Sequence, residues 1–214
     1  KEFSQLFHDL DEATKTNDRL DHLVKYLTDA DPKDSIWVCW FLAGNRIKGA
    51  IKTSELRTFA SERSGLPQWL LEECHDRVGD LAETISLLIS SQGEGSGMVG
   101  LAELIKKFIE PMVGMEIEQR RENIFAAWDF LGEKDFLPFH KLLTGGFRMG
   151  VSKGNLCKAL ARVGGVQPAI IAQRLAGNWS PKTLRMEGIL NPGVDEDREC
   201  QPFPFCLANP LQEE

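Results

Sequence analysis

The sequence lacks long apolar runs, paired cysteines and an excess of positive charge. Its longest apolar stretch, Ile36 to Ala43, falls far short of the roughly 20 residues that a membrane-spanning helix needs. No basic-then-apolar leader opens the sequence, so no signal peptide is expected. The five cysteines contain no Cys-x-x-Cys pair, which argues for a reducing compartment and against a disulfide framework or a zinc site. The net charge of −7 argues at first against a nucleic-acid partner.

Apolar residues at helical spacing run through the whole sequence. One example is the stripe formed by Phe3, Leu6, Phe7 and Leu10. No segment alternates apolar and polar residues for long enough to form a strand. Asp80 and Glu83 predict a capping box at the start of a helix that runs to about Ile89. We therefore predict an all-α fold.

A weak repeat divides a helical domain over 1–190 into two halves, about 1–91 and 99–190, with a Gly/Ser-rich linker at 92–98. Gly44 and Gly49 recur as Gly145 and Gly150. The pattern continues at an offset of 100, where Leu56, Gly65, Leu66, Leu70 and Leu71 match Leu156, Gly165, Val166, Ile170 and Ile171. Duplication predicts two similar half-domains related by a pseudo-twofold axis, and chance similarity between helical hairpins is the alternative. Residues 191–214 are Pro-rich and irregular.

Positive charge is concentrated in one part of the chain. The 51 residues between Asp135 and Glu187 hold eight basic side chains and no acidic one. The corresponding turn of the first half also contains basic residues without an acid. Because a local field attracts a polyanion even when the net charge is negative, this segregation favours a nucleic-acid partner. A solvated basic face with no partner is the alternative.

Two glycine turns carry the most specific chemistry: the first glycine turn, residues 44–52, and the second glycine turn, residues 145–152. Glycine lets backbone amides approach a ligand that a Cβ would hold away. Ser152 is placed to cap a helix whose N-terminal amides can bind an anion, and Arg148 can contact phosphate. Lys52 and Thr53 repeat this arrangement in the first half. Two well-capped helix starts are the alternative, which leaves the glycine–arginine cluster unexplained.

Other residue types indicate no catalytic or metal site. The four histidines are scattered without ligand spacing, and no Ser/His/Asp constellation can be formed from the sequence. The five tryptophans fit apolar helix faces and are expected in the core. We therefore predict no catalytic and no metal-binding residues.

Four stretches carry a resemblance to a known family: Trp37 to Gly44, Ser64 to Leu70, Val78 to Thr84 and, most specifically, Leu142 to Ser152. Over essentially its whole length the chain resembles the N-terminal DNA-binding domain of ATP-dependent DNA ligases, and most closely the bacterial group associated with the cisplatin damage response. This resemblance implies an all-helical domain of two pseudo-symmetric halves. It implies binding of nicked double-stranded DNA through the minor groove and the phosphate backbone, without sequence specificity, in repair and recombination.

The resemblance also implies which residues bind DNA. In the second half they are Gly145, Gly146, Arg148, Gly150, Ser152 and Lys153. In the first half they are Arg46, Lys48, Lys52 and Thr53. A weaker group lies in the polar turn between the first two helices and consists of Thr16, Asn17 and Arg19.

One departure from the family pattern limits what this chain does alone. Ligases of this class carry a Lys-x-Asp-Gly motif whose lysine takes AMP, and the motif does not occur here. We therefore expect the front portion of a bacterial cytoplasmic ligase acting at the nucleoid, inactive by itself and without a cofactor of its own. Its partners would be nicked duplex DNA and the adenylation and OB domains of the same parent chain, which would use ATP and Mg. A helical scaffold whose basic face docks an acidic protein partner is the alternative.

Overall fold

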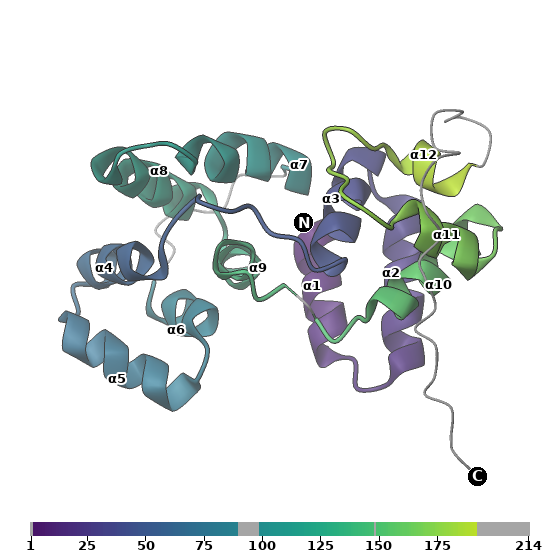
Figure 1. Cartoon of the computed structure of the whole chain (residues 1–214). Helices are drawn as coiled ribbons and strands as arrows, with labels where there is room; N and C mark the ends of the chain where they lie inside the picture. Colours follow the sequence, from purple (N-terminus) through teal and green to yellow (C-terminus); the bar gives the residue numbers. More distant parts are fainter. Residues whose placement is uncertain (1, 90–98, 148, 192–214) are drawn as a thin grey trace, which may run out of the picture.

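The computed structural model describes residues 2–89, 99–147 and 149–191, and this part of the chain is built from helices and loops without a strand (Figure 1). The predicted all-α fold is confirmed. Within these ranges no helix is both long enough and apolar enough to span a bilayer. The predicted linker, Arg148 and the Pro-rich segment from 192 onward lie outside the described residues.

Each half of the sequence supplies six α-helices in the described part. The first half forms α1 (Glu2–Glu12), α2 (Thr16–Asp29), α3 (Pro32–Leu42), α4 (Thr53–Ser64), α5 (Gln68–Val78) and α6 (Leu81–Leu88). The second half forms α7 (Leu101–Leu104), α8 (Ile117–Phe130), α9 (Glu133–Thr144), α10 (Lys153–Gly164), α11 (Pro168–Arg174) and α12 (Met186–Leu190). A π-helical turn, η1 (Ile105–Ile109), and a 3-10 turn, η2 (Glu110–Met112), extend α7 toward α8.

Local capping explains where several of these helices begin. The Asp80 side chain accepts the Glu83 amide at 2.9 Å, which confirms the predicted cap of α6. Ser152 accepts the Asn155 amide at 3.2 Å and caps α10 as predicted. Helix α4 differs, because Lys52 is its N-cap and Thr53 is its first helical residue. The expectation that Thr53 caps this helix is therefore wrong.

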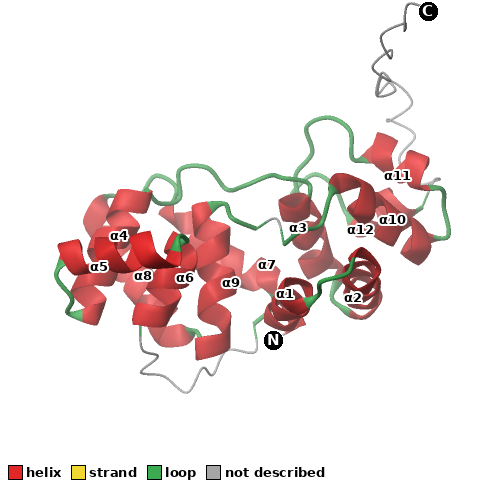
Figure 2. Ribbon diagram, turned by 90° about the horizontal axis from the view of Figure 1, so that it is seen from below, coloured by secondary structure: helices red, strands yellow, loops and turns green. Residues whose placement is uncertain are grey.

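The two halves of the sequence do not form separate half-domains. Helix α10 packs against α2 and α12 packs against α3, whereas α4 packs against α8 and α6 against α9. Helices of the first half thus pack with helices of the second half in each of two groups, one containing α1–α3 and α10–α12 and the other α4–α9 (Figures 1 and 2). The expectation of half-domains over 1–91 and 99–190 is corrected, because each glycine turn carries the chain from one helix group to the other.

Two equivalent contacts between the helix groups are consistent with the predicted pseudo-symmetry. The buried Asp34 of α3 accepts the Ala102 amide at the start of α7, with 2.8 Å between the Asp34 Oδ1 and the amide nitrogen. Asp135 of α9, 101 residues later, accepts a hydrogen bond from the Ser4 hydroxyl at the start of α1. One acidic position in each half therefore holds the first helix of the other half.

A buried polar chain links three helices of the α4–α9 group. Trp128 Nε1 donates to His140 Nε2 at 2.8 Å, so the imidazole proton lies on Nδ1 and is donated to Ser86 Oγ at 2.9 Å. The Ser86 hydroxyl in turn donates to the Ala82 carbonyl at 2.6 Å. Burial lowers the pKa of His140 to about 3, so the ring is neutral. Both ring nitrogens of His140, the Trp128 indole N–H and the Ser86 hydroxyl are hydrogen-bonded.

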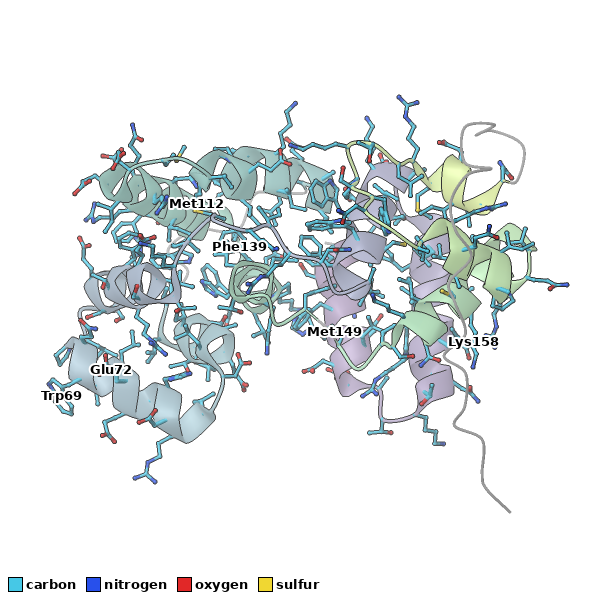
Figure 3. The ribbon with its side chains drawn as sticks, viewed as in Figure 1. Trp69, Glu72, Met112, Phe139, Met149 and Lys158 are labelled. Atoms are coloured by element: carbon cyan, nitrogen blue, oxygen red, sulfur yellow. The ribbon has the colours of Figure 1, made fainter. Side chains whose placement is uncertain are left out.

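The tryptophans do not all lie in the core. Trp128 is fully buried, and Trp37, Trp40 and Trp179 are partly buried against the core. Trp69 instead projects from the start of α5 with 64% of its surface exposed (Figure 3). The expectation of five core tryptophans is wrong at this position, because the apolar stripe of α5 is narrow and buries Leu71.

Removing the buried carboxylate between α3 and α7 should destabilise the fold. We expect Asp34→Ala to lower the free energy of unfolding by about 1–3 kcal/mol, because the Ala102 amide loses its partner. Urea unfolding measures the change. Asp76→Ala, at a side chain that is 80% exposed, is the control and should have little effect. Equal losses in the two variants would contradict the role of Asp34.

The neutral His140 should make the fold sensitive to mild acid. Because its pKa is about 3 when folded and about 6.5 when unfolded, its contribution is complete above pH 6.5 and is lost as the pH falls toward 3. Between these two pKa values, the contribution of His140 to the slope of the unfolding free energy against pH approaches about 1.4 kcal/mol per pH unit. We therefore expect the free energy of unfolding, measured with urea from pH 7 to pH 4, to fall less steeply in His140→Gln than in the native chain. A parallel dependence in the two proteins would contradict the buried neutral state.

Candidate nucleic-acid interface

The first and second glycine turns cross between the two helix groups and touch one another. The first turn joins α3 to α4, and the second joins α9 to α10 (Figure 1). Gly44, Gly49, Gly145 and Gly150 all have positive φ, at 95°, 78°, 80° and 64°, which explains why glycine recurs at these positions. Arg46 of the first turn packs on Gly145 of the second, with its Cδ 3.3 Å from where a Cβ would lie.

Buried apolar residues anchor both turns, while their polar residues face solvent. Phe147 is 3% exposed and packs against the rings of Phe3, Phe7 and Phe41. Val151 and Ala50 are also buried. The predicted site residues that are exposed in the two turns and at the helix starts that follow them are Arg46, Lys48, Lys52, Thr53, Gly145, Gly146, Gly150, Ser152 and Lys153. Arg148 lies outside the described residues.

The weaker predicted group joins the second glycine turn. Thr16 and Asn17 are exposed at the start of α2, and Arg19 is half-buried one turn later. Arg19 Nε donates to the Leu10 carbonyl at 3.2 Å. Its Nη1 lies 2.7 Å from the position that a Cβ on Gly150 would take. Three predicted groups that are far apart in the sequence are therefore brought together.

The structure gives two glycines a role that the sequence did not indicate. Glycine was expected to leave room for a ligand at the backbone. At Gly145 and Gly150 this room is filled by the side chains of Arg46 and Arg19. The space beside Gly44 and Gly49 is open, since a Cβ at either position would have no atom within 4 Å. The second turn thus uses glycine to seat two arginines.

Acidic residues from elsewhere in the chain neutralise part of the acid-free segment. The ion pairs are Lys141 with Asp80 at 2.7 Å, Arg162 with Asp21 at 3.0 Å, and Lys182 with Glu110 at 2.9 Å. Burial opposes ionisation of Asp80, but hydrogen bonds from Lys141 and the Glu83 amide outweigh it and lower the Asp80 pKa. The segment is therefore less positive than its sequence predicts.

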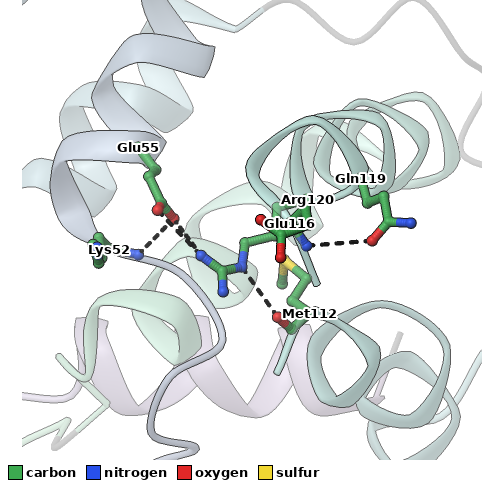
Figure 4. Close-up of polar contacts among 6 residues, drawn as sticks. All are labelled: Lys52, Glu55, Met112, Glu116, Gln119 and Arg120. Atoms are coloured by element: carbon green, nitrogen blue, oxygen red, sulfur yellow. Dashed lines mark hydrogen bonds and ion pairs between the residues drawn. The ribbon is translucent and has the colours of Figure 1, made fainter. Parts of the chain in front are cut away.

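Lys153 forms no ion pair among the described residues. In the described ranges no carboxylate lies within 4.0 Å of the Lys153 ammonium group. Sequence reasoning singled out neither Arg120 nor Glu55, which form a buried ion pair beside the first turn (Figure 4). The repeat could have pointed to Arg120, because it lies 101 residues after Arg19, at the same offset as the turn glycines.

The surface around the two glycine turns carries exposed basic side chains that can bind a polyanion, and the described residues offer no group of metal ligands there. Among the described residues no three His, Cys, Asp or Glu side chains are placed to hold a metal ion. Exposed basic side chains on the first turn, and Lys153 directly after the second, suit contacts to phosphates.

Comparison with known proteins identifies the family. Residues 1–161 match the family model described as DNA ligase N terminus. No curated protein matches the chain. The chain belongs to the DNA ligase N terminus family and is an N-terminal domain of an ATP-dependent DNA ligase. Its assignment to the bacterial cisplatin-response group stays a prediction.

Two glycine substitutions should have opposite effects on stability. Gly150→Ala should lower the free energy of unfolding by roughly 1–2 kcal/mol or more, because it combines positive φ with a collision against Arg19. Gly154→Ala, in the first turn of α10, should raise it by about 0.5–1 kcal/mol, because a methyl group there makes only an ordinary contact. Thermal and urea unfolding measure both. Stabilisation by Gly150→Ala would contradict the seating of Arg19.

Proposed function

We propose that this domain binds nicked double-stranded DNA through the phosphate backbone and the minor groove, without sequence specificity, for a ligase that acts in DNA repair and recombination. The observation that carries the proposal is the contact between the two glycine turns. It places Arg46 beside Gly145, and Arg19 of α2 lies beside Gly150 of the second turn. Phosphate contacts from such a surface position a duplex without reading its bases.

The arrangement of helices supports binding across a strand break. Both turns connect the two helix groups, and each half of the sequence contributes one turn to the shared surface. A pseudo-symmetric protein surface suits a duplex on both sides of a nick, because the backbone has the same chemistry on each side. Arg46, Lys48 and Lys153 supply exposed positive charge for these contacts.

The sealing chemistry would belong to the other domains of the parent ligase. The adenylation domain would supply the lysine that takes AMP, and ATP and Mg would act there with the OB domain. This chain has no Lys-x-Asp-Gly motif, so its part is to hold the DNA. We place the parent enzyme in the bacterial cytoplasm, at the nucleoid.

Salt dependence tests the proposal directly. If four to six phosphates are bound, a plot of log K against log salt should have a slope of roughly −4 to −5. Lys153→Glu and Lys48→Glu should weaken binding of a fluorescent nicked duplex evenly across sequences and make the slope shallower by at least about 1. Arg148→Ala should likewise weaken binding evenly.

Lys106→Glu is the matched control, because it makes the same charge change in η1, outside both glycine turns. Loss of binding confined to one DNA sequence would indicate base readout, and a flat salt response would remove the proposal. If an acidic protein partner is the natural ligand instead, duplex DNA should fail to bind in moderate salt and fail to compete with an acidic polypeptide.

A further inference from the structure

Helix α5 presents an aromatic and acidic face to solvent, which we call the α5 outer face. It consists of Trp69, Glu72, Glu73 and Asp76, at positions i, i+3, i+4 and i+7 of one side of the helix. All four are exposed, whereas Leu71 on the opposite side is fully buried. Figure 3 shows Trp69 at the outer edge of the molecule, projecting away from the other helices. Nothing in the described part of the chain covers this face.

The fold does not require the α5 outer face, because the equivalent helix of the second half lacks it. Leu71 of α5 and Ile171 of α11 are 100 residues apart and both fully buried, so the two helices turn the same side to the core. At this offset the four residues of the α5 outer face correspond to Ala169, Ala172, Gln173 and Ala176. The tryptophan and the three acids are therefore particular to the first half.

The three carboxylates of the α5 outer face are not neutralised by a lysine or arginine. Within the described ranges no such side chain lies within 4.0 Å of any of them. Glu72 accepts a hydrogen bond from the neutral side-chain amide of Gln68 at 3.2 Å. Asp76 Oδ1 lies 3.9 Å from Nδ1 of the neighbouring His75. A cationic partner would therefore find carboxylates that the chain itself leaves without a strong counter-charge.

Trp69 adds apolar contact area to these charges, since 64% of its surface is exposed. Tryptophan buries a large area on binding and is enriched among the residues that dominate the energy of protein interfaces. Its ring face also attracts a cation, and arginine both stacks on an aromatic ring and binds a carboxylate through two N–H groups. A tryptophan one helical turn from two glutamates therefore favours arginine as the group that it contacts.

We infer that the α5 outer face docks another protein, through a segment that presents arginine side chains beside an apolar one. The apolar side chain would cover part of Trp69, and the arginines would pair with the three carboxylates. This inference goes beyond the proposed function, because carboxylates repel the phosphates of DNA. Helix α5 also lies at the outer end of the α4–α9 group, away from the second glycine turn (Figures 1 and 2). The domain can therefore hold DNA and a basic protein segment together.

Binding of a fluorescein-labelled amphipathic Arg/Leu peptide, measured by fluorescence anisotropy, tests the inference. We expect the domain to bind this peptide saturably and to bind the same peptide with glutamine in place of arginine much more weakly. Trp69→Ala should weaken binding of the Arg/Leu peptide by about tenfold or more, because it removes the main apolar contact. Glu72→Gln combined with Glu73→Gln should also weaken binding and make it less dependent on salt.

A pair of acids on another helix gives the matched control. Glu118→Gln combined with Glu122→Gln removes the same two charges from exposed positions of α8 and should change the peptide affinity by less than about twofold. Urea unfolding should show every variant as stable as the native chain, because each altered side chain is exposed. Equal weakening by the α5 and α8 pairs would mean that the peptide follows net charge alone, and would overturn the inference.

The remaining outcomes separate this inference from the proposed function and from other occupants of the α5 outer face. Binding of a nicked duplex should be unchanged by Trp69→Ala, and a loss of DNA affinity in this variant would mean that the face contacts DNA instead. If sedimentation velocity shows self-association that Trp69→Ala abolishes, the occupant is a second copy of this chain and a separate partner is wrong. If the peptide binds and duplex DNA does not, only the proposed function fails.

Discussion

The structure depends on the exchange of helices between the two halves of the chain. Neither half buries all of its apolar surface by itself, because α2 and α3 pack against α10 and α12, and α4 and α6 pack against α8 and α9. Each half therefore needs one connection that crosses between the groups, and the two glycine turns provide these connections, each with left-handed backbone at two glycines. The surface we assign to DNA is a direct product of this crossing, since it consists of the connections themselves.

Periodicity and capping residues were sufficient to predict the helical fold and the starts of α6 and α10. The repeat of Gly44 and Gly49 as Gly145 and Gly150 also led to the correct turns. Sequence could not show that the halves exchange helices, because apolar stripes identify a buried face but not the helix that covers it. For the same reason Trp69 was assigned to the core, although α5 buries only Leu71.

The candidate site was predictable in part. Its glycines and lysines were found from their spacing and lie at the surface as expected. The electrostatics were not predictable, because an acid-free stretch of sequence gains acidic neighbours on folding: Asp80 reaches Lys141, and Asp21 reaches Arg162. The same process gives Arg120 a buried acid as its partner. Local charge along a sequence therefore indicates where a polyanion site is possible, and tertiary pairing decides which side chains serve it.

The exchanged helices also bear on how the chain is made. During synthesis α1–α3 leave the ribosome first, but α10–α12, the helices that cover them, follow more than 100 residues later. Contacts of such long sequence separation slow folding, since the loop between them must close before they form. The first three helices can pack against one another, but α2 and α3 lack their contacts with α10 and α12 until nearly the whole domain has emerged, whereas the α4–α9 group becomes complete earlier. The nascent domain is therefore expected to assemble from its middle outward.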